Sequence, residues 1–408
     1  MSLKTRKKMR RLLFLITIAL MVTEGLYAQI GEFENWLKKP DGELSAQKFA
    51  KAKLDKKECQ RAAEIMDSIW LKSSAKRLGA GWKKMILKND SLQLACACRN
   101  FGMLPKDGYS LYISLHGGGE CPKEVNDEQW MNQIYLYQLN EGVYVAPRAP
   151  WNTWDLWHRK GLDELLEELI QACVLFEGVN PNKVYLLGYS AGGDGVWRLA
   201  PRMADKWAAA AMMAGHPGNA SQANLLNLPF TIWMGAEDTA YDRNRLAREK
   251  GNVLDSLAAA YPGKYIHMTN IIEGKGHWMD GLDTEAIGWM AQYRRNPYPK
   301  RIIWRQEEVV REHFYWLSAP AEELQHGKTV EARIEGNTIH IDRCDYKKLT
   351  IYLNDNMLNL DKNVVVRHKG KKIANRKLRR NITNLYNTLN TRNDRSYSFP
   401  CMLEIKID

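Results

Sequence analysis

A chain of 408 residues exceeds what a single hydrophobic core usually serves, so the sequence predicts one large domain and a smaller one. Its composition, 45% hydrophobic and 26% charged residues, is typical of globular proteins and excludes an extensively disordered chain. The formal net charge is +12, but six of the basic residues lie before Leu12. Without them and Glu24 the charge is only +7, so overall basicity does not demand a polyanionic partner.

Residues 1–28 have the three-part form of a secretory signal peptide. A basic start is followed by an apolar stretch from Leu12 to about Val22, and small residues precede a cleavage site that we place after Ala28. An uncleaved membrane anchor is the alternative, but the apolar stretch is shorter than the roughly 20 residues that span a bilayer. We therefore expect a periplasmic or secreted protein with no stable membrane insertion after cleavage.

Residues 29–79 are predicted to form an N-terminal helical segment. Apolar residues recur at helical spacing from Ser45 to about Lys76, among many Lys and Glu. Two alternating runs follow, "WKKMILKN" and "LQLACACRNF", separated by the turn-forming "NDS". This arrangement predicts an antiparallel pair of strands.

Residues 80–297 are predicted to form the main domain, because short apolar runs there alternate with helix-length segments. Strands that are apolar on both sides and separated by helices indicate a mostly parallel sheet with helices on both faces. The fold class is therefore α/β. The apolar runs lie at residues 111–115, 143–146, 184–187, 208–213, 230–234 and 265–270.

Residues 298–408 are predicted to form a smaller, β-rich domain. "NPYPKRI" interrupts the α/β pattern, and the runs beyond it alternate with Gly, Asn and Asp turns. The densest basic run of the chain, "RHKGKKIANRKLRR", lies here at residues 367–380. It has no interleaved aromatic residues, so it indicates a solvated face rather than a nucleic-acid site.

The segment "VYLLGYSAGG" places Ser190 at the centre of a G-x-S-x-G pattern, immediately after an apolar strand. Small neighbours allow a tight strand-to-helix turn that exposes the serine hydroxyl, with the backbone N–H of Ala191 beside it. Taken alone, the pentapeptide could be a Gly-rich loop without chemistry. A serine hydroxyl becomes a nucleophile only beside a base, usually a histidine that a carboxylate orients.

Candidates for the base and the carboxylate follow two later strands. "GAEDTAYD" supplies Asp238, with Glu237 and Asp242 as alternatives, and "EGKGHW" supplies His277 in a Gly-bracketed loop. His216 and His267 are the alternative histidines, although His267 lies within a predicted strand. The order Ser190, Asp238, His277 matches the order used when a G-x-S-x-G serine is part of a triad.

"LYISLHGGGE" supplies candidate donors for an oxyanion hole. Its glycines follow an apolar strand and allow backbone N–H groups to point at a substrate carbonyl, with Gly118 as the first choice beside Ala191. A phosphate-binding loop is the competing interpretation. No Lys-Ser/Thr follows the glycines and no G-x-G-x-x-G spacing is present, which argues against nucleotide binding.

The loop "APWNTWDLWHRKG" is unusually rich in tryptophan and follows another strand. Trp154, Trp157 and His158 are candidate substrate contacts, because clustered indoles can form a wall for a sugar ring or an aromatic acyl group. The alternative is a loop that packs its indoles against a helix. To the same surface we assign His116 and Gly119 of the glycine-rich loop, and Trp278 beside the candidate base.

Together, "LYISLHGGG", "GYSAGG", "GAEDTAY" and "EGKGHW" resemble the α/β-hydrolase superfamily over about residues 80–295. The resemblance is strongest to its secreted esterase branch, which includes feruloyl and acetyl-xylan esterases and polyhydroxybutyrate depolymerases. It implies Ser190 as nucleophile, His277 as acid and base, Asp238 as orienting carboxylate, and the amides of Ala191 and Gly118 as the oxyanion hole. No metal or organic cofactor is implied.

The sequence therefore predicts an exported serine hydrolase that cleaves carboxylic esters, with acylated polysaccharide as one candidate substrate. A prolyl-oligopeptidase-like peptidase, which shares these motifs, is the nearest alternative. A catalytically silent carbohydrate-binding protein is the third hypothesis. It would not need Ser, Asp and His at three separate strand ends.

Overall fold

The structure, a computed structural model, describes residues 29–89 and 91–407, so the predicted signal peptide at 1–28 lies outside the described residues. The chain divides into two compact units, and each unit is assembled from three separate segments of the sequence. One contains residues 29–73, 352–364 and 376–403. The other contains residues 74–351, 365–375 and 404–407. In the part of the chain that the structure describes, no helix is both long and apolar enough to cross a membrane.

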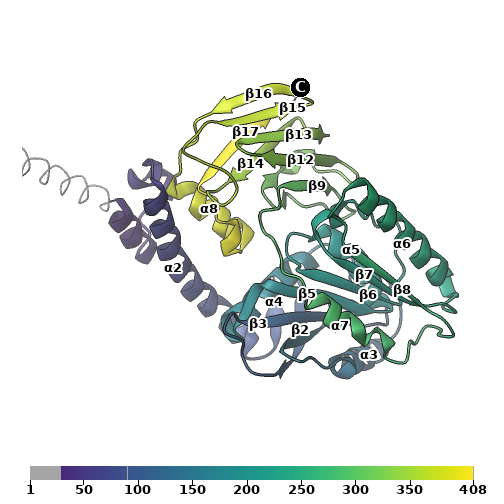
Figure 1. Ribbon diagram of the computed structural model, residues 1–408. Coiled ribbons are helices and arrows are strands. Elements are labelled where there is room, and N and C mark those ends of the chain that lie inside the picture. The colour runs from purple at the N-terminus through teal and green to yellow at the C-terminus, as the bar shows by residue number, and fades with distance from the viewer. Residues whose placement is uncertain (1–28, 90, 408) are drawn as a thin grey trace, which may run out of the picture. The chain divides into compact units, whose positions relative to one another are not determined.

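The larger unit contains a mostly parallel sheet, in agreement with the α/β prediction (Figure 1). Its order is β1-β2-β4-β3-β5-β6-β7-β8. The strands are β1 (Ile86–Lys88), β2 (Gln93–Phe101), β3 (Tyr109–Leu115), β4 (Gly142–Arg148), β5 (Val179–Tyr189), β6 (Ala209–Met213), β7 (Phe230–Gly235) and β8 (His267–Ile272). The pair β1 and β2 is antiparallel, as predicted, and β2 also runs antiparallel to β4. The remaining neighbours are parallel.

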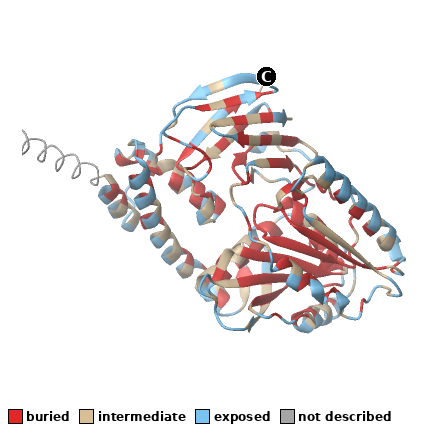
Figure 2. Ribbon diagram, viewed as in Figure 1, coloured by how far each residue is buried: buried red, intermediate tan, exposed pale blue. Residues whose placement is uncertain are grey.

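Helices cover both faces of this sheet, and its central strands are buried (Figure 2). The helices are α3 (Lys123–Leu136), α4 (Leu162–Phe176), α5 (Ala191–Arg202), α6 (Arg243–Ala260) and α7 (Glu285–Met290). Alternate residues of β5, including Tyr185 and Leu187, share an apolar core with residues of α3 and α7. On the opposite face, Trp197 of α5 packs its ring 4.8 Å from that of Phe230. Burial on both faces explains why these strands are apolar throughout rather than alternating.

A β-rich region follows the main sheet, as the sequence predicted. One sheet has the order β16-β15-β13-β12-β9 and another the order β10-β11-β14-β17. The strands are β9 (Arg301–Arg305), β10 (His313–Phe314), β11 (Leu317–Ser318), β12 (Thr329–Glu335), β13 (Thr338–Cys344), β14 (Lys348–Leu353), β15 (Val364–His368), β16 (Lys371–Arg376) and β17 (Cys401–Lys406). Arg311, between β9 and β10, pairs with Asp163 and Glu167 of α4 at 2.9 and 2.6 Å. This ion-pair cluster joins the start of the β-rich region to the main sheet's helices.

The smaller unit joins the N-terminal segment to a helix near the C-terminus. Its core includes Phe33 and Leu54 from one end of the sequence, and Ile382 and Leu385 from the other. The second pair belongs to α8 (Ile382–Arg392), which was not predicted within the β-rich region. Ile382, Leu385 and Leu389 are spaced three and four residues apart and Asn381 caps the helix, so a local helical signal was present.

Residues 29–38 are helical, but the helix predicted from Ser45 begins later than expected. Residues 44–46 and 49–51 form short 3₁₀ turns, and α2 spans Lys56–Trp82. The start is fixed by a reciprocal capping interaction, in which the Glu58 N–H donates to Asp55 Oδ1 and the Asp55 N–H donates to Glu58 Oε2. Helical periodicity between Ser45 and Asp55 was therefore misleading, because the cap stops α2 from extending backwards.

Candidate active site

Ser190 occupies the turn between β5 and α5 in a strained backbone conformation, with φ 57° and ψ −122°. The turn is possible because the residues two positions before and after Ser190 are glycines. A Cβ on Gly192 would lie 2.0 Å from the carbonyl oxygen of Leu115, and one on Gly188 would lie 2.4 Å from that of Gly192. The two glycines of the G-x-S-x-G pattern are thus required by close backbone contacts. The turn predicted around Ser190 is present.

His277 bridges Ser190 and Asp238. Its Nε2 lies 2.9 Å from Ser190 Oγ, and its Nδ1 lies 2.7 Å from Asp238 Oδ2. Because a carboxylate only accepts hydrogen bonds, Nδ1 carries the proton and Nε2 is left to accept the one from the hydroxyl. The three candidate side chains come from the ends of β5, β7 and β8, as the sequence order required.

Of the alternative acids and bases, His216 lines a pocket beside Ser190, whereas Glu237, Asp242 and His267 do not line it. Glu237 is exposed, and Asp242 pairs with Arg245 at 3.1 Å. His267 has its Nε2 3.0 Å from Asp255. The side chain of Asp238 is 1% exposed, and the guanidinium of Arg243 approaches its second oxygen to 3.7 Å. Among these candidates, Asp238 is therefore the carboxylate that contacts the His277 imidazole.

Tyr189, which the sequence interpretation did not single out, holds the loop that carries His277. Its hydroxyl donates to the carbonyl oxygen of His277 at 2.8 Å and accepts from the N–H of Met279 at 3.0 Å. Its ring also lies 6.1 Å from the imidazole. Because Tyr189 immediately precedes Ser190, this side chain couples the position of the histidine to the turn that presents the serine.

The amides expected to bind an oxyanion, those of Gly118 and Ala191, flank Ser190. Within residues 29–89 and 91–407, neither amide donates to a protein acceptor. The N–H of Gly119, by contrast, donates to Asn126 Oδ1 at 2.8 Å. Gly118 has a φ of +101°, and a Cβ there would lie 2.3 Å from Asn126 Oδ1. Asn126 thus fixes the glycine turn and leaves the Gly118 amide available.

Two residues predicted to contact substrate, His116 and Trp157, are instead fully buried beneath the glycine turn. The indole N–H of Trp157 donates to the carbonyl oxygen of His116 at 2.9 Å. Burial lowers the pKa of His116 to about 4, so its imidazole is neutral at pH 7. Nδ1–H then donates to the Gly117 carbonyl oxygen at 2.6 Å, and Nε2 accepts from the Ala149 N–H at 3.1 Å. These side chains support the glycine turn rather than forming a substrate wall.

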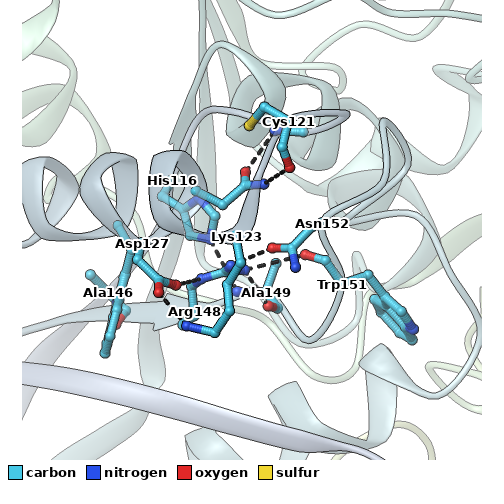
Figure 3. A network of polar contacts seen from close by, with 12 residues as sticks. His116, Cys121, Lys123, Asp127, Ala146, Arg148, Ala149, Trp151 and Asn152 are labelled. Carbon is cyan, nitrogen blue, oxygen red and sulfur yellow. Dashed lines mark hydrogen bonds and ion pairs between the residues drawn. The ribbon is translucent and has the colours of Figure 1, made fainter.

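Arg148 extends this support beneath the neighbouring loop (Figure 3). Its guanidinium donates to Asp127 Oδ1 at 2.8 Å and to the carbonyl oxygens of Ala149 and Trp151 at 2.7 and 3.2 Å. Asn152 accepts a further bond. The end of β4, the start of α3 and the Trp-containing loop are therefore joined through one side chain whose charge is compensated by Asp127.

Two pockets of different chemistry meet at Ser190. The first, about 620 Å³, has a mostly apolar lining that includes Trp278, Tyr189, Leu136 and Val125. His277 and the glycine turn also line it, as do the amide side chains Gln129, Asn132 and Gln133. We call it the apolar pocket.

The second pocket, about 520 Å³, opens on the other side of Ser190 and includes Asp194, Arg198, Arg243, His216 and Tyr241 in its lining. We call it the polar pocket. Three of the residues predicted to contact substrate line it as well: Gly119, Trp154 and His158. Burial raises the pKa of Asp194 to about 6 and lowers that of His158 to about 4.

In the described residues, no group of three or more His, Cys, Asp or Glu is placed to hold a metal ion.

Sheet order and side-chain positions together decide the fold. An antiparallel start leads into parallel strands, a strained serine turn follows β5, and the acid and histidine follow β7 and β8. The fold is that of the α/β-hydrolases. The resemblance inferred from the motifs is thereby confirmed at the level of the fold.

Comparisons with known proteins add the following similarities. No protein-family model and no curated protein sequence matches the chain. Among solved structures, a thermostable esterase is similar at 17% identity and a TM-score of 0.41, over 52% of this chain and 62% of that one, less than two thirds of its length. A ferulic acid esterase shows 15% identity and a TM-score of 0.33, over 51% and 95% of the two chains. The feruloyl esterase module from Clostridium thermocellum shows 13% and 0.35, over 51% and 86%.

Proposed function

We propose that this α/β-hydrolase is a serine hydrolase of carboxylic esters. The observation that carries the proposal is the continuous contact from Ser190 through His277 to Asp238, at 2.9 and 2.7 Å. Beside it lie two amides that donate to no acceptor in the described part of the chain. A structural role for these groups would not require a strained serine between two pockets. Strain of this kind is a feature of functional sites.

The proposed reaction has two halves. In the first, Ser190 Oγ attacks the ester carbonyl carbon while His277 Nε2 takes its proton, and the amides of Gly118 and Ala191 stabilise the oxyanion. His277 then gives the proton to the departing alkoxide oxygen, and the carbon–oxygen bond of the ester breaks. In the second half, His277 deprotonates a water that attacks the acyl-enzyme, and the acid leaves as the Ser190 hydroxyl reforms. Asp238 keeps the imidazole in the required tautomer and stabilises its positive charge.

We confine the proposal to carboxylic esters. Of the tryptophans considered as a wall for a sugar ring or an aromatic acyl group, Trp157 is buried away from solvent. Trp154 is 61% exposed and Trp278 is 52% exposed, so aromatic surface remains in both pockets. The predicted signal at residues 1–28 adds the proposal that hydrolysis takes place in the periplasm or outside the cell. Immunoblotting of fractionated cells would test that location.

Covalent labelling tests the nucleophile directly. A fluorophosphonate probe should modify the wild-type protein, and Ser190→Ala should abolish both the label and the hydrolysis of p-nitrophenyl acetate. Ser256→Ala is the matched control, because this serine lies on the surface of α6 and donates only to a carbonyl oxygen of its own helix. Labelling that persists in Ser190→Ala would overturn the proposal. Cleavage of an aminoacyl-nitroanilide with negligible ester cleavage would reassign the enzyme to the peptidases.

A further inference from the structure

His277 lines only one of the two pockets beside Ser190, and this indicates which pocket holds the alcohol part of the ester and which holds the acyl part. His277 lines the apolar pocket, whereas the lining of the polar pocket includes Ser190 and Ala191 but not His277. The alcohol oxygen of the substrate must receive its proton from His277, so the leaving alcohol extends on the histidine's side. The acyl group then extends into the polar pocket. This assignment rests on the proposed function.

The apolar pocket suits an apolar or aromatic alcohol. Tyr189 and Trp278 contribute rings whose centroids lie 5.5 Å apart, and Leu136 and Val125 add aliphatic surface. A shallower depression of about 640 Å³ shares Trp278 and Leu136 and continues over exposed Met131 and Tyr135. A large alcohol therefore has apolar surface to cover beyond the pocket itself.

The polar pocket contains hydrogen-bonding groups of both kinds, recessed from the surface. The side chains of Arg198 and Arg243 are 12% and 13% exposed. Arg198 donates to Asn219 Oδ1 and lies 3.7 Å from a carboxylate oxygen of Glu308. Arg243 donates to the carbonyl oxygen of Ala240 at 3.4 Å and lies 3.7 Å from Asp238 Oδ1. Arginine carries five N–H donors, so both keep donors for a ligand.

Asp194 supplies the acceptor. One of its oxygens accepts from the backbone N–H of His216, and the carboxylate lines the pocket within the first turn of α5. At the rim, Trp154 and Tyr241 are 61% and 77% exposed. Recessed carboxylate and guanidinium groups beneath exposed aromatic faces fit a ring that carries several hydroxyl groups, since each hydroxyl both donates and accepts.

We propose that the substrate is an ester of a sugar acid, such as a uronate, with an apolar or aromatic alcohol. The sugar ring, as the acyl part, would be held by Asp194, Arg198 and Arg243 in the polar pocket. The alcohol would lie against Tyr189 and Trp278. Ser190 Oγ forms a bond to the carboxyl carbon of the sugar acid, the bond to the alcohol oxygen breaks, and the alcohol leaves with the proton from His277. Water then releases the free uronate and regenerates the serine.

The direction of the ester can be tested with three substrates that share the same bulk. Benzyl glucuronate carries the sugar as acyl part, benzyl cyclohexanecarboxylate replaces it by an apolar ring, and methyl 6-O-benzoylglucoside carries the sugar as alcohol. We expect kcat/KM for benzyl glucuronate to exceed those for the other two by tenfold or more. A preference for the benzoylglucoside would reverse the assignment of the pockets. Equal rates on all three would overturn the proposal as a whole.

Substitutions in the polar pocket test whether its side chains cause the preference for benzyl glucuronate. Arg198→Gln should lower the ratio of kcat/KM for benzyl glucuronate to that for p-nitrophenyl acetate by about ten- to hundredfold, the range for removing a hydrogen bond from a charged donor. Arg248→Gln is the matched control, because this arginine of α6 pairs with Glu273 on the surface and should leave the ratio unchanged. Asp194→Asn, which keeps an acceptor for the His216 N–H, should also lower the ratio.

The outcomes separate the two proposals. If p-nitrophenyl acetate is hydrolysed and Ser190→Ala is inactive, but neither Arg198→Gln nor Asp194→Asn changes the ratio in a protein that remains folded, the sugar-acid assignment fails alone. If the wild-type enzyme hydrolyses none of the esters, the proposed function fails. Thermal unfolding of each variant shows whether it is folded.

Discussion

Replacing His116 with glutamine should remove a specific part of the pH dependence of stability. The imidazole is fully buried, and burial lowers its pKa from 6.5 to about 4. The unfolded chain therefore binds a proton near pH 6.5 that the folded protein does not bind until about pH 4. The stabilising contribution of the neutral form is complete above pH 6.5 and is lost as the pH falls from 6.5 towards 4.

The size of this loss follows from the two pKa values. Integrating the difference in proton uptake from pH 7.5 to pH 5 gives about 2 kcal/mol of lost stability for this group alone. Glutamine does not titrate, so the variant lacks the contribution. Other groups, including His158, remain in both proteins and cancel in the comparison.

Urea unfolding at pH 7.5 and pH 5, followed by tryptophan fluorescence, measures the effect. The decrease in unfolding free energy on acidification should be about 2 kcal/mol larger for the wild type than for His116→Gln. The variant is expected to be less stable at pH 7.5, because glutamine cannot reproduce both ring hydrogen bonds. Equal decreases in the two proteins would refute the conclusion that this imidazole is buried in its neutral form.

Three further substitutions test the site. Gly192→Ala places a Cβ 2.0 Å from a β3 carbonyl oxygen and should destabilise the protein by about 3 kcal/mol or more in thermal unfolding. Gly288→Ala is the control, because a Cβ there would have no neighbour within 4 Å beyond the backbone of its own helix and should not destabilise the protein. Equal effects of the two substitutions would contradict the turn geometry. Asp238→Asn should lower kcat on p-nitrophenyl acetate by about 10³- to 10⁴-fold by favouring the wrong tautomer of His277, and a loss below tenfold would exclude it as the orienting acid. Tyr189→Phe leaves a buried N–H unpaired and should cost about 1–3 kcal/mol and reduce kcat; unchanged kcat would show that the histidine loop does not depend on it.

The sequence was informative where a local pattern carries a strict steric or topological requirement. The G-x-S-x-G spacing identified the turn because both glycines are needed by contacts under 3 Å. The order of Ser190, Asp238 and His277 placed them at one edge because parallel strands end on the same side of a sheet. Asp238 could be preferred over its neighbours in the sequence, but only the geometry shows that it is the one in contact.

The sequence did not show which side chains of a loop face the core. Trp154 and Trp157 are three residues apart in one loop, yet one is 61% exposed and the other is fully buried. Composition treats both as potential ligand contacts, and the difference arises from the tertiary hydrogen bond between the Trp157 indole and the His116 carbonyl oxygen. Helix α8 was missed for a different reason: its apolar spacing and Asn381 cap are visible in the sequence, but the surrounding turn-rich runs favoured a β-rich interpretation.

The packing of α8 against the N-terminal segment determines when the smaller unit can fold. The apolar face built from residues such as Phe33 and Leu54 gains its partner, Ile382 and Leu385, only after some three hundred further residues have been synthesised. Until then this apolar face lacks the part of its core that α8 supplies. Completion of this core therefore requires residues from both ends of the described chain.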